Sequence, residues 1–586
     1  MLIRALLRFL SWTTITFVAM NHYRLFIYVL YRAGHFILLH FNPFAGIILF
    51  LNISLMSLAV LLSKINDQYI DKNECLTLKA GEEKIKPVYT EYTVEKYNNT
   101  VKAFFDGKDN AFVDLFGFTM LVGSVLPGSP VVNSILGWIV HLTKFSWILP
   151  IIHFTLHNLG FMVFDESHFL IDVEKIKSNA DRLRGKKVVF ILPTNGRNLK
   201  TVAKSVLSVV YWSEVVKNRL EHTSLDIVSW IVVEEDNYMD NLEFYEDIRL
   251  LGCRVIVVPK NFQTANKTQH KARALTYALE VMRQERLTTE NVWIYHQDDE
   301  TMVGEDTIFG IIDYIQSAGP RDVYAAGIII YPDGWRWNVS QTQEPVRSYD
   351  DVRILLATKI KRVLSFGHHG SHLLVRADVE ERIGWDFGNV KAEDWIFGLR
   401  ILQEYWPLKT VLKGFAYEKP PLMVKDMLSQ RRRWALGALN VIRRRDLWLR
   451  YRLAALYAVV SWLAALPSLI ALILNIINPT GGLFTGSGAL AGFIWFSLFR
   501  AYQKGYELNR PYIKGLKKSL KNKVKTALAI GFGMVLESIA PWYALLRPTK
   551  KFEVIAKDGQ EDEVFSNSSL FSICPPASQT SREPRT

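Results

Sequence analysis

Two acidic segments of the chain have residue types and spacing that could support chemistry, and the first indicates a metal site. In HQDDET (296–301), the carboxylates of Asp298, Asp299 and Glu300 follow an apolar run. Like charges so close repel, and a divalent cation relieves the repulsion. Because alternate residues of an extended segment point the same way, we expect Asp298 and Glu300 to share Mg²⁺ or Mn²⁺ with diphosphate oxygens. A solvated acidic loop is the alternative.

Histidines near this segment raise a different metal chemistry. A zinc site needs a defined tetrahedral set of ligands, and the spacing of these histidines does not supply one. We therefore prefer the cation held by oxygen ligands. The histidines concerned are His296, His368, His369 and His372.

The second acidic segment, KAEDWIFGLR (391–400), indicates a general base. Glu393 and Asp394 open an expected helix, where carboxylates also gain from the helix dipole, so simple capping is the alternative. We expect both residues to belong to a catalytic centre in which Asp394 removes the proton from an attacking hydroxyl group.

Two further polar segments follow expected strands and are candidates for binding a nucleotide. In LPTNGRN (192–198), Thr194 and Asn195 follow the first strand, and in VVEED (232–236), Glu235 and Asp236 follow the second. Carboxylates at a strand end can accept hydrogen bonds from a base or a ribose. An ordinary strand–helix turn and a solvated strand end are the alternatives.

A basic pair is a candidate for binding phosphate. TQHKARAL (268–275) places Lys271 and Arg273 at the start of an expected helix, where cationic side chains and the helix N-terminus both favour phosphate charge. A basic surface turn is the alternative.

The elements that must position these residues alternate between strands and helices. Apolar runs at 186–194, 224–236, 253–259 and 291–300 read as buried strands, with helical patterns at 199–212 and 269–283 between them. This alternation predicts a three-layer α/β domain over about 175–440, with a mostly parallel sheet. Ligands of such sheets bind beyond the carboxyl ends of the strands, where the polar segments lie.

Apolar segments flank this domain and predict a multi-pass membrane protein. Region 1–164 contains several, including 44–62, and is interrupted by a polar insert at about 64–110. Region 453–546 contains expected spans at 453–477 and 483–499, and a segment at 527–546 that either spans the membrane or lies in the interface. Residues 556–586 are expected to be disordered.

Basic residues place the α/β domain on the cytosolic side. One cluster precedes the span at 453–477 and another follows the span at 483–499, so both fall on the same side, which the positive-inside rule makes cytosolic. The clusters are Arg443, Arg444, Arg445, Arg450 and Arg452, and Lys514, Lys517, Lys518, Lys521, Lys523 and Lys525.

The overall composition and charge limit the kinds of binding partner that we expect for this chain. The net charge of +13 comes with no nucleic-acid-binding motif, so membrane lipid and a phosphorylated small molecule are the expected anionic partners. Only three cysteines occur, far apart, which provides neither a disulfide framework nor a thiolate metal site.

The segment SQRRRW (429–434) resembles the Gln-x-x-Arg-Trp motif that ends the nucleotide-sugar domain of family-two inverting glycosyltransferases. Gln430, Arg433 and Trp434 match it. The resemblance implies a GT-A-like domain in which Arg433 meets the donor diphosphate, while Gln430 and Trp434 line the acceptor site. We expect Arg431 and Arg432 to face anionic lipid headgroups.

A closer likeness covers about 271–434. KARAL, DDET, GSHLLVRADVEERIGWDFG, AED and SQRRRW together resemble the egghead-type β-1,4-mannosyltransferases, which extend glucosylceramide with mannose from GDP-mannose. By analogy the segment 367–388 forms the acceptor-side wall, with Trp385 stacked on a sugar ring. A core tryptophan is the alternative for Trp385. The Asp-x-Glu of 298–300 departs from the widespread Asp-x-Asp of the family.

These features predict a membrane enzyme that transfers a hexose, preferably mannose, from a nucleotide-diphosphate sugar to a lipid-linked acceptor with inversion to a β linkage. The donor is GDP-mannose or a UDP-sugar. A processive polysaccharide synthase that resembles hyaluronan or chitin synthases, and so acts on a growing glycan, is the alternative within the family. A membrane scaffold or transporter that keeps a non-catalytic sugar-binding domain is the alternative outside it.

Overall fold

The computed structural model describes residues 88–106, 166–220, 225–332, 343–360, 368–406, 409–421, 423–477, 498, 501–513 and 520–549. Of region 1–164, the structure describes residues 88–106, which belong to the polar insert. The predicted membrane segments of this region lie outside the described residues. So do the tail at 556–586 and, except for residue 498, the span predicted at 483–499.

An eight-stranded mixed sheet forms the centre of the molecule, in the order β3-β2-β1-β4-β7-β6-β8-β5. The prediction of a mostly parallel sheet is confirmed for β1 to β4, which pair in parallel, whereas the rest of the sheet is mixed. There β7 runs antiparallel to both β4 and β6, and β5 runs antiparallel to β8, while β6 and β8 are parallel. The strands are β1 (Lys187–Thr194), β2 (Asp226–Glu234), β3 (Arg254–Val258), β4 (Val292–His296), β5 (Met302–Val303), β6 (Tyr324–Ile330), β7 (Leu373–Arg376) and β8 (Val411–Tyr417).

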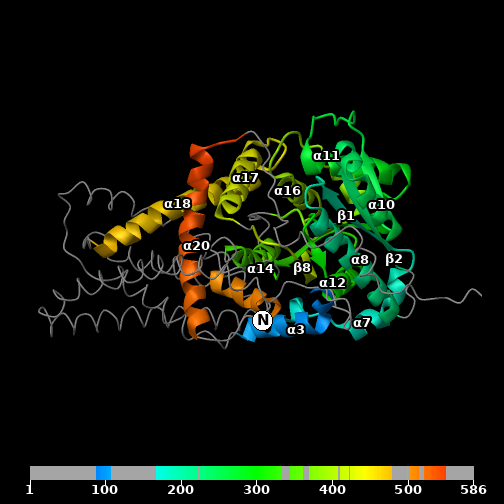
Figure 1. Ribbon diagram of the computed structural model, residues 1–586, viewed down its shortest axis with the longest axis horizontal. Helices are drawn as coiled ribbons and strands as arrows, with labels where there is room; N and C mark the ends of the chain where they lie inside the picture. Colours follow the sequence, from blue (N-terminus) through cyan, green and yellow to red (C-terminus); the bar gives the residue numbers. More distant parts are fainter. Residues whose placement is uncertain are drawn as a thin grey trace, which may run out of the picture.

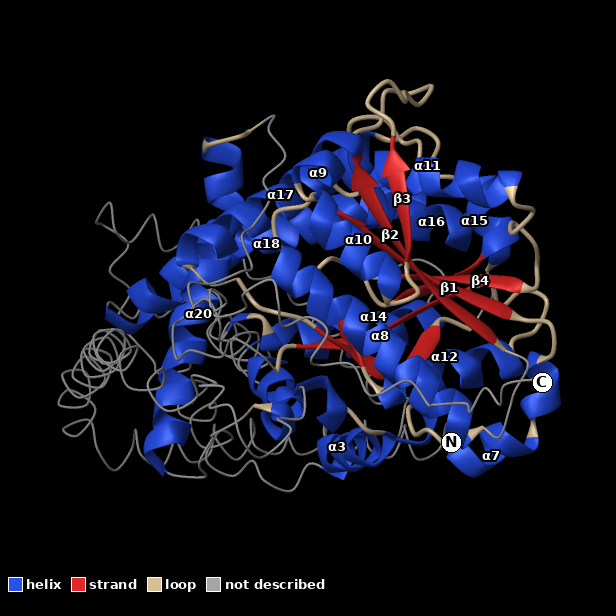
Figure 2. Ribbon diagram, turned by 45° about the vertical axis from the view of Figure 1, so that its right-hand side comes forward, coloured by secondary structure: helices blue, strands red, loops and turns tan. Residues whose placement is uncertain are grey.

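Helices cover both faces of the parallel half of the sheet (Figure 2). The chain passes from β1 to β3 in one direction and then returns to place β4 on the other side of β1. Because parallel crossovers are right-handed, the helices of the outward and return connections fall on opposite faces. The outward helices are α8 (Leu199–Arg219), α9 (Glu235–Asp240) and α10 (Leu242–Leu250), and the return helix is α11 (His270–Gln284).

Later helices pack on the mixed half of the sheet and continue away from it. The helix α12 packs on β8 and α14 on β6, while α15 packs on β4, β7 and α16. These elements are α12 (Glu305–Ser317), α14 (Pro345–Ile360), α15 (Ala377–Ile383) and α16 (Glu393–Tyr405). The shorter elements beneath them are η1 (Val88–Glu91), α3 (Val94–Asp106), η3 (Glu166–His168), α7 (Val173–Ser178) and η4 (Ala180–Leu183).

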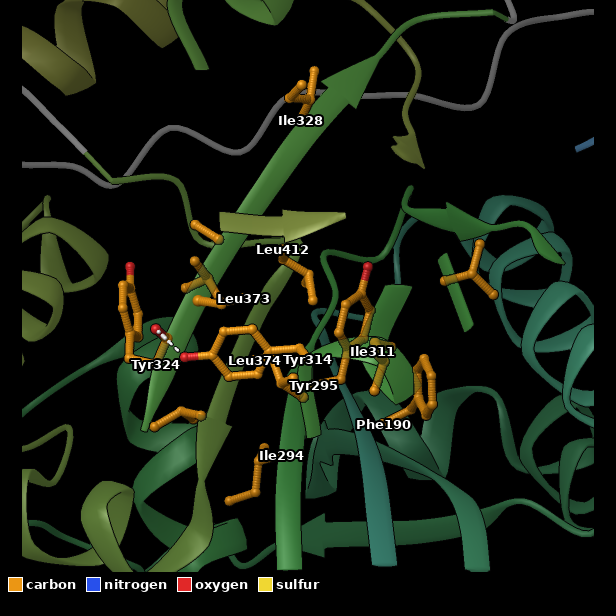
Figure 3. Packing of buried hydrophobic residues seen from close by; sticks show 14 of the residues in the cluster. Phe190, Ile294, Tyr295, Ile311, Tyr314, Tyr324, Ile328, Leu373, Leu374 and Leu412 are labelled. Carbon is orange, nitrogen blue, oxygen red and sulfur yellow. Dashed lines mark hydrogen bonds between the residues drawn. The ribbon is translucent and has the colours of Figure 1, made fainter. Parts of the chain in front are cut away.

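The core lies where the parallel and antiparallel halves of the sheet meet (Figure 3). All five residues of β4 are buried, as expected for a strand covered on both faces. The rings of Phe190 and Tyr295 pack with centroids 4.8 Å apart. The hydroxyl of Tyr314, on α12, donates a hydrogen bond of 2.9 Å to the carbonyl oxygen of Tyr324. This packing fixes β4 next to β7, and the candidate site depends on that pairing.

Three helices follow the sheet and pack together, with α18 extending away from the α/β core and α20 running across α18 (Figure 1). They are α17 (Val424–Arg443), α18 (Leu449–Ile477) and α20 (Leu520–Leu546), with η5 (Arg510–Tyr512) before the last. Within the described ranges one segment, Leu449–Ile470 of α18, is long and apolar enough to cross a membrane, and α20 contains a shorter apolar segment, Gly531–Leu546. The multi-pass arrangement stays a prediction.

Candidate active site

A cavity of about 720 Å³ opens at the carboxyl edge of the parallel strands and extends to α18. Its first part is lined by residues at the ends of β1 and β2, and its middle by the two acidic segments and Lys271. Its far part is lined by α14, α17 and α18. Ten of the predicted site residues line this one cavity: Thr194, Asn195, Lys271, Asp298, Glu300, Glu393, Asp394, Gln430, Arg433 and Trp434.

The antiparallel pairing of β4 with β7 builds the middle of the site. His296 at the end of β4 is opposite Leu373 at the start of β7, and the amide of His372 donates to the carbonyl oxygen of His296 at 2.9 Å. The residues before β7 therefore lie beside those after β4. As a result the ammonium of Lys271 donates to the carboxylate of Asp298 and, at 2.7 Å, to the carbonyl oxygen of Gly370.

Gly370 separates Lys271 from the predicted base. A Cβ atom built on Gly370 would lie 2.7 Å from Nζ of Lys271 and 3.3 Å from Oδ2 of Asp394. The backbone here approaches both charged groups closely because glycine has no side chain.

Gly370→Ala is therefore expected to push the flexible Lys271 side chain out of place and to lower kcat about tenfold, which is about 1.4 kcal/mol of transition-state stabilisation. The melting temperature should change little, since the displaced atom is the end of a lysine side chain. Steady-state kinetics and thermal unfolding of the variant measure the two effects. A variant with wild-type kcat would show that the Lys271 position does not matter.

Charge and burial set the protonation of the two carboxylates at the start of α16. Burial raises the pKa of Asp394, while the ammonium of Lys271 lowers it. Burial, and then the neighbouring charge of Asp394, raises the pKa of Glu393 to about 7. Oδ1 of Asp394 accepts a hydrogen bond of 2.8 Å from the amide of Trp395, which leaves Oδ2 toward Gly370. A carboxylate with a raised pKa is a stronger base than an ordinary aspartate.

A buried carboxylate not identified from the sequence, Glu418, lies beside the predicted metal residues. Burial raises the pKa of Glu418, and the negative charges of Glu300 and Asp298 raise it further. Glu418 is 3% exposed, lines the cavity, and accepts hydrogen bonds from Thr301 at 2.9 Å and from Ser371. The pairing of Met302 in β5 with Tyr417 in β8 places it there.

These carboxylates fit a divalent cation whose other ligands come from a phosphate. In the described part of the chain no three His, Cys, Asp or Glu side chains form a complete ligand set. Asp298 and Glu300 nonetheless line one cavity with Glu418, whose pKa is raised first by burial and then by their negative charges, and a cation would offset that like-charge repulsion. Mg²⁺ and Mn²⁺ are commonly held by one or two carboxylates and substrate phosphates.

The cavity lining near the end of β2 differs from the prediction by a single position. Glu234 and Asn237 line the cavity, and Glu235 and Asp236 do not. The helix α9 begins at Glu235 and turns the next side chains outward. The carboxylate of Glu235 accepts from the amide of Lys260 at 2.8 Å, and Asp236, 66% exposed at its side chain, pairs with the Lys260 ammonium at 3.0 Å.

Arg273 is also absent from the cavity lining, and its side chain instead connects two segments of the domain. Its guanidinium donates to the carboxylate of Glu234 and to the carbonyl oxygens of Pro259 and Phe262, at 2.7 and 3.0 Å. It ties the end of β2 to the segment after β3. The position of Arg273 therefore does not support the prediction that it binds phosphate.

Trp385 is a core residue rather than a wall of the acceptor site. Its side chain is 1% exposed, its ring stacks on Phe397 at 4.1 Å, and its indole N–H donates to Glu380 at 2.7 Å. The sequence alone does not show this burial, because a sugar-binding tryptophan and a core tryptophan can have the same neighbouring residues.

The histidines are held by protein groups. Burial lowers the pKa of both His368 and His372 to about 3, so both rings are neutral near pH 7. Nδ1 of His368 lies 2.6 Å from the hydroxyl of Tyr324, and Nδ1 of His372 lies 2.7 Å from that of Tyr295. These contacts favour a structural role over zinc binding.

One face of α17 carries the three residues of the Gln-x-x-Arg-Trp motif into the cavity lining. Gln430, Arg433 and Trp434 are spaced so that they share a helix face, and all three line the cavity. The cavity continues past them to Val459 and Trp462 of α18. Arg431 is not part of the cavity lining and its side chain is 1% exposed, so the expectation that it faces lipid headgroups is wrong.

Comparisons with known proteins match part of this chain to one family and to several relatives. Residues 293–502 match the family described as Glycosyl transferase family group 2. The β-1,4-mannosyltransferase egh of Drosophila melanogaster is 27% identical over 316 residues, which are 52% of this chain and 66% of that protein. The β-1,4-mannosyltransferases bre-3 of Caenorhabditis briggsae and Caenorhabditis elegans are each 25% identical over 334 residues, 56% of this chain and 68% of theirs.

A solved structure of the mannosyltransferase PcManGT from Pyrobaculum calidifontis, in complex with GDP-Man and Mn²⁺, matches 64% of this chain and 96% of its own. The sequence identity is 14% and the TM-score is 0.40. The family match over residues 293–502 and the fly and nematode relatives confirm that this chain resembles the family-two glycosyltransferases. The β-1,4-mannosyltransferases are among its relatives.

Proposed function

We propose that this chain is an inverting glycosyltransferase that moves mannose from GDP-mannose to a lipid-linked acceptor, forming a β linkage. The observation that carries the proposal is the single cavity in which Asp298, Asp394 and Trp434 meet before it reaches α18. The names of the fly and nematode relatives support mannose as the sugar.

The proposed mechanism is a single displacement. Oδ2 of Asp394 takes the proton of the acceptor hydroxyl as that oxygen bonds to the anomeric carbon of mannose. The bond from the anomeric carbon to the diphosphate oxygen breaks on the opposite face, so the configuration inverts and GDP leaves with the bonding electrons. Lys271 and Arg433, which line the cavity near Asp394, stabilise the negative charge that grows on the diphosphate.

Asp298 and Glu300 would hold the cation in this proposal. When bound, a divalent cation supplies Lewis-acid stabilisation of the leaving diphosphate. Lys271 is paired with Asp298, so its ammonium lies next to this predicted cation ligand.

Removal of divalent cations with a chelator is expected to lower turnover by about 10²-fold or more, because several kcal/mol of charge stabilisation are lost. Added Mn²⁺ or Mg²⁺ should restore it. Asp298→Asn should raise the metal concentration needed for half-maximal activity, and a titration of activity against Mn²⁺ measures this shift. Full activity in excess chelator would rule out the metal-dependent scheme.

The far end of the cavity supports a lipid-linked acceptor. Apolar side chains of Leu355, Val459 and Trp462 line it there, next to the helix that is long enough to cross a membrane. The first turns of α18 also expose Leu449, Leu453 and Leu456, at 63%, 53% and 43%, on one stripe of the helix. An acceptor with its sugar at Trp434 and its chain toward α18 would fit this gradient from polar to apolar.

A donor and acceptor screen with the purified chain in detergent micelles tests the proposal. GDP-mannose with a β-glucosyl lipid is expected to give a product one mannose larger. UDP-sugars are expected to give none. A ladder of long products would support the processive synthase instead, and no transfer from any donor would support the non-catalytic alternative.

A further inference from the structure

The first arginine of SQRRRW, Arg431, is a buried ion-pair residue although two further arginines follow it directly. Its side chain is 1% exposed, and its guanidinium donates to Oε1 of Glu344 at 2.8 Å and to both oxygens of Glu537, at 3.0 and 3.1 Å. It also donates to Oε1 of Gln430 at 2.5 Å. Three segments far apart in sequence, the start of α14, α17 and α20, thus meet at one side chain.

Glu344 connects a second guanidinium to the same place. Its other oxygen, Oε2, accepts from Arg347 at 2.8 Å, and the Glu344 side chain is 0% exposed. The guanidinium carbons of Arg347 and Arg431 lie 4.8 and 4.3 Å from the ring centroid of Trp434. One carboxylate therefore holds both cations that contact the indole ring, in contacts of the cation–π kind.

Glu537 ties α20 to the same end of the cavity in two ways. Its carboxylate binds Arg431, and its backbone carbonyl oxygen accepts the indole N–H of Trp462 at 3.0 Å. Trp434 and Trp462 both line the cavity. The apolar helix α20 thus contacts Trp462 directly and Trp434 through Arg431, although it is not part of the cavity lining.

We propose that Glu344, Arg431 and Glu537 are positioning residues that fix the ring of Trp434 for the acceptor, which makes α20 part of the acceptor site. This proposal rests on the proposed function, because it assigns the network to that reaction's second substrate. A purely architectural link between helices does not need buried charge, since apolar packing replaces buried ion pairs with little or no loss of stability. The charged network instead sets a defined orientation for a ring that faces a cavity.

The test compares Glu537→Gln and Glu344→Gln with Arg432→Gln in the full chain. Arg432 is the control because it lies next to Arg431 on α17, and its variant also changes the charge by one unit, although of the opposite sign. It also contacts α20, donating to Tyr543 at 3.3 Å and to the carbonyl oxygen of Arg547 at 3.2 Å. The guanidinium carbon of Arg432 lies 4.9 Å from the ring centroid of Tyr543, whereas that of Arg431 lies 4.3 Å from the ring centroid of Trp434.

Glu537→Gln and Glu344→Gln are expected to raise the KM for a β-glucosyl lipid about tenfold, with the Kd for GDP-mannose changed less than about twofold. Arg432→Gln should behave as wild type in both. Glu537→Asp, which keeps the charge, should recover most of the lost acceptor affinity. Calorimetric binding of GDP-mannose also shows that each variant is folded.

The positioning role is overturned if Glu537→Gln and Glu344→Gln bind donor normally and show the acceptor KM of Arg432→Gln. It is also overturned if Glu537→Asp is no better than Glu537→Gln, since charge would then not matter. Failure of the wild-type chain to mannosylate any lipid would refute the proposed function, and with it an acceptor role for the network. The two failures are distinguished by the wild-type reaction.

Discussion

Asp394→Asn is expected to lower kcat by about 10²–10⁴-fold and to leave the Kd for GDP-mannose nearly unchanged. The amide cannot take the proton of the acceptor hydroxyl, yet it has the size of the carboxylate and can still accept from the amide of Trp395. Single-turnover kinetics with saturating donor, together with calorimetric donor binding, measure the two quantities.

Asp226→Asn is the matched control for this loss. Asp226 starts β2, at the opposite end of the strand from the cavity, and its side chain is 52% exposed beside Lys187. Its variant should keep wild-type kinetics. If Asp394→Asn kept most of its turnover, another group would have to be the base.

Asp394 also determines how we expect activity to fall at low pH. A base works only when deprotonated, and burial raises the pKa of Asp394 above that of an ordinary aspartate. Activity should therefore fall as the pH drops through this raised value, at higher pH than a solvent-exposed aspartate would cause.

Lys271→Met is expected to lower kcat by about 10²–10³-fold, the usual cost of removing one preorganised charge from the leaving group. It should also move the acid side of the kcat/KM profile to higher pH, because the ammonium of Lys271 lowers the pKa of Asp394. A pH–rate profile of the variant separates these two effects.

Lys260→Met serves as the control, since Lys260 pairs with Asp236 outside the cavity and is 74% exposed at its side chain. It should change neither kcat nor the pH profile. An unshifted acid limb in Lys271→Met, with turnover lost, would show that Lys271 acts on the donor alone and not on Asp394.

Local features of the sequence predicted much of this site. The four parallel strands and the helices α8 and α11 follow patterns that occur within single segments, so their ends, and the polar residues at those ends, were predictable. The helical spacing of Gln430, Arg433 and Trp434 likewise places them on one face without knowledge of the rest of the fold.

Features that depend on pairing between distant segments were not predictable in this way. Glu418 reaches the acidic segment only because β5 and β8 pair in antiparallel register, and Gly370 reaches Lys271 only because β7 lies antiparallel to β4. Arg431 is buried because a carboxylate on α20, more than a hundred positions along the chain, approaches it. Glu234 lines the cavity and the predicted Glu235 does not, because the start of α9 sets which side chain turns inward.

The most direct test of the central claim is product analysis with the purified chain, radiolabelled GDP-mannose and a β-glucosyl lipid. The account predicts a lipid product carrying one added mannose, released by a β-mannosidase and not by an α-mannosidase. An α-linked mannose, a polymer, or no mannosylated lipid alongside intact donor binding would contradict it.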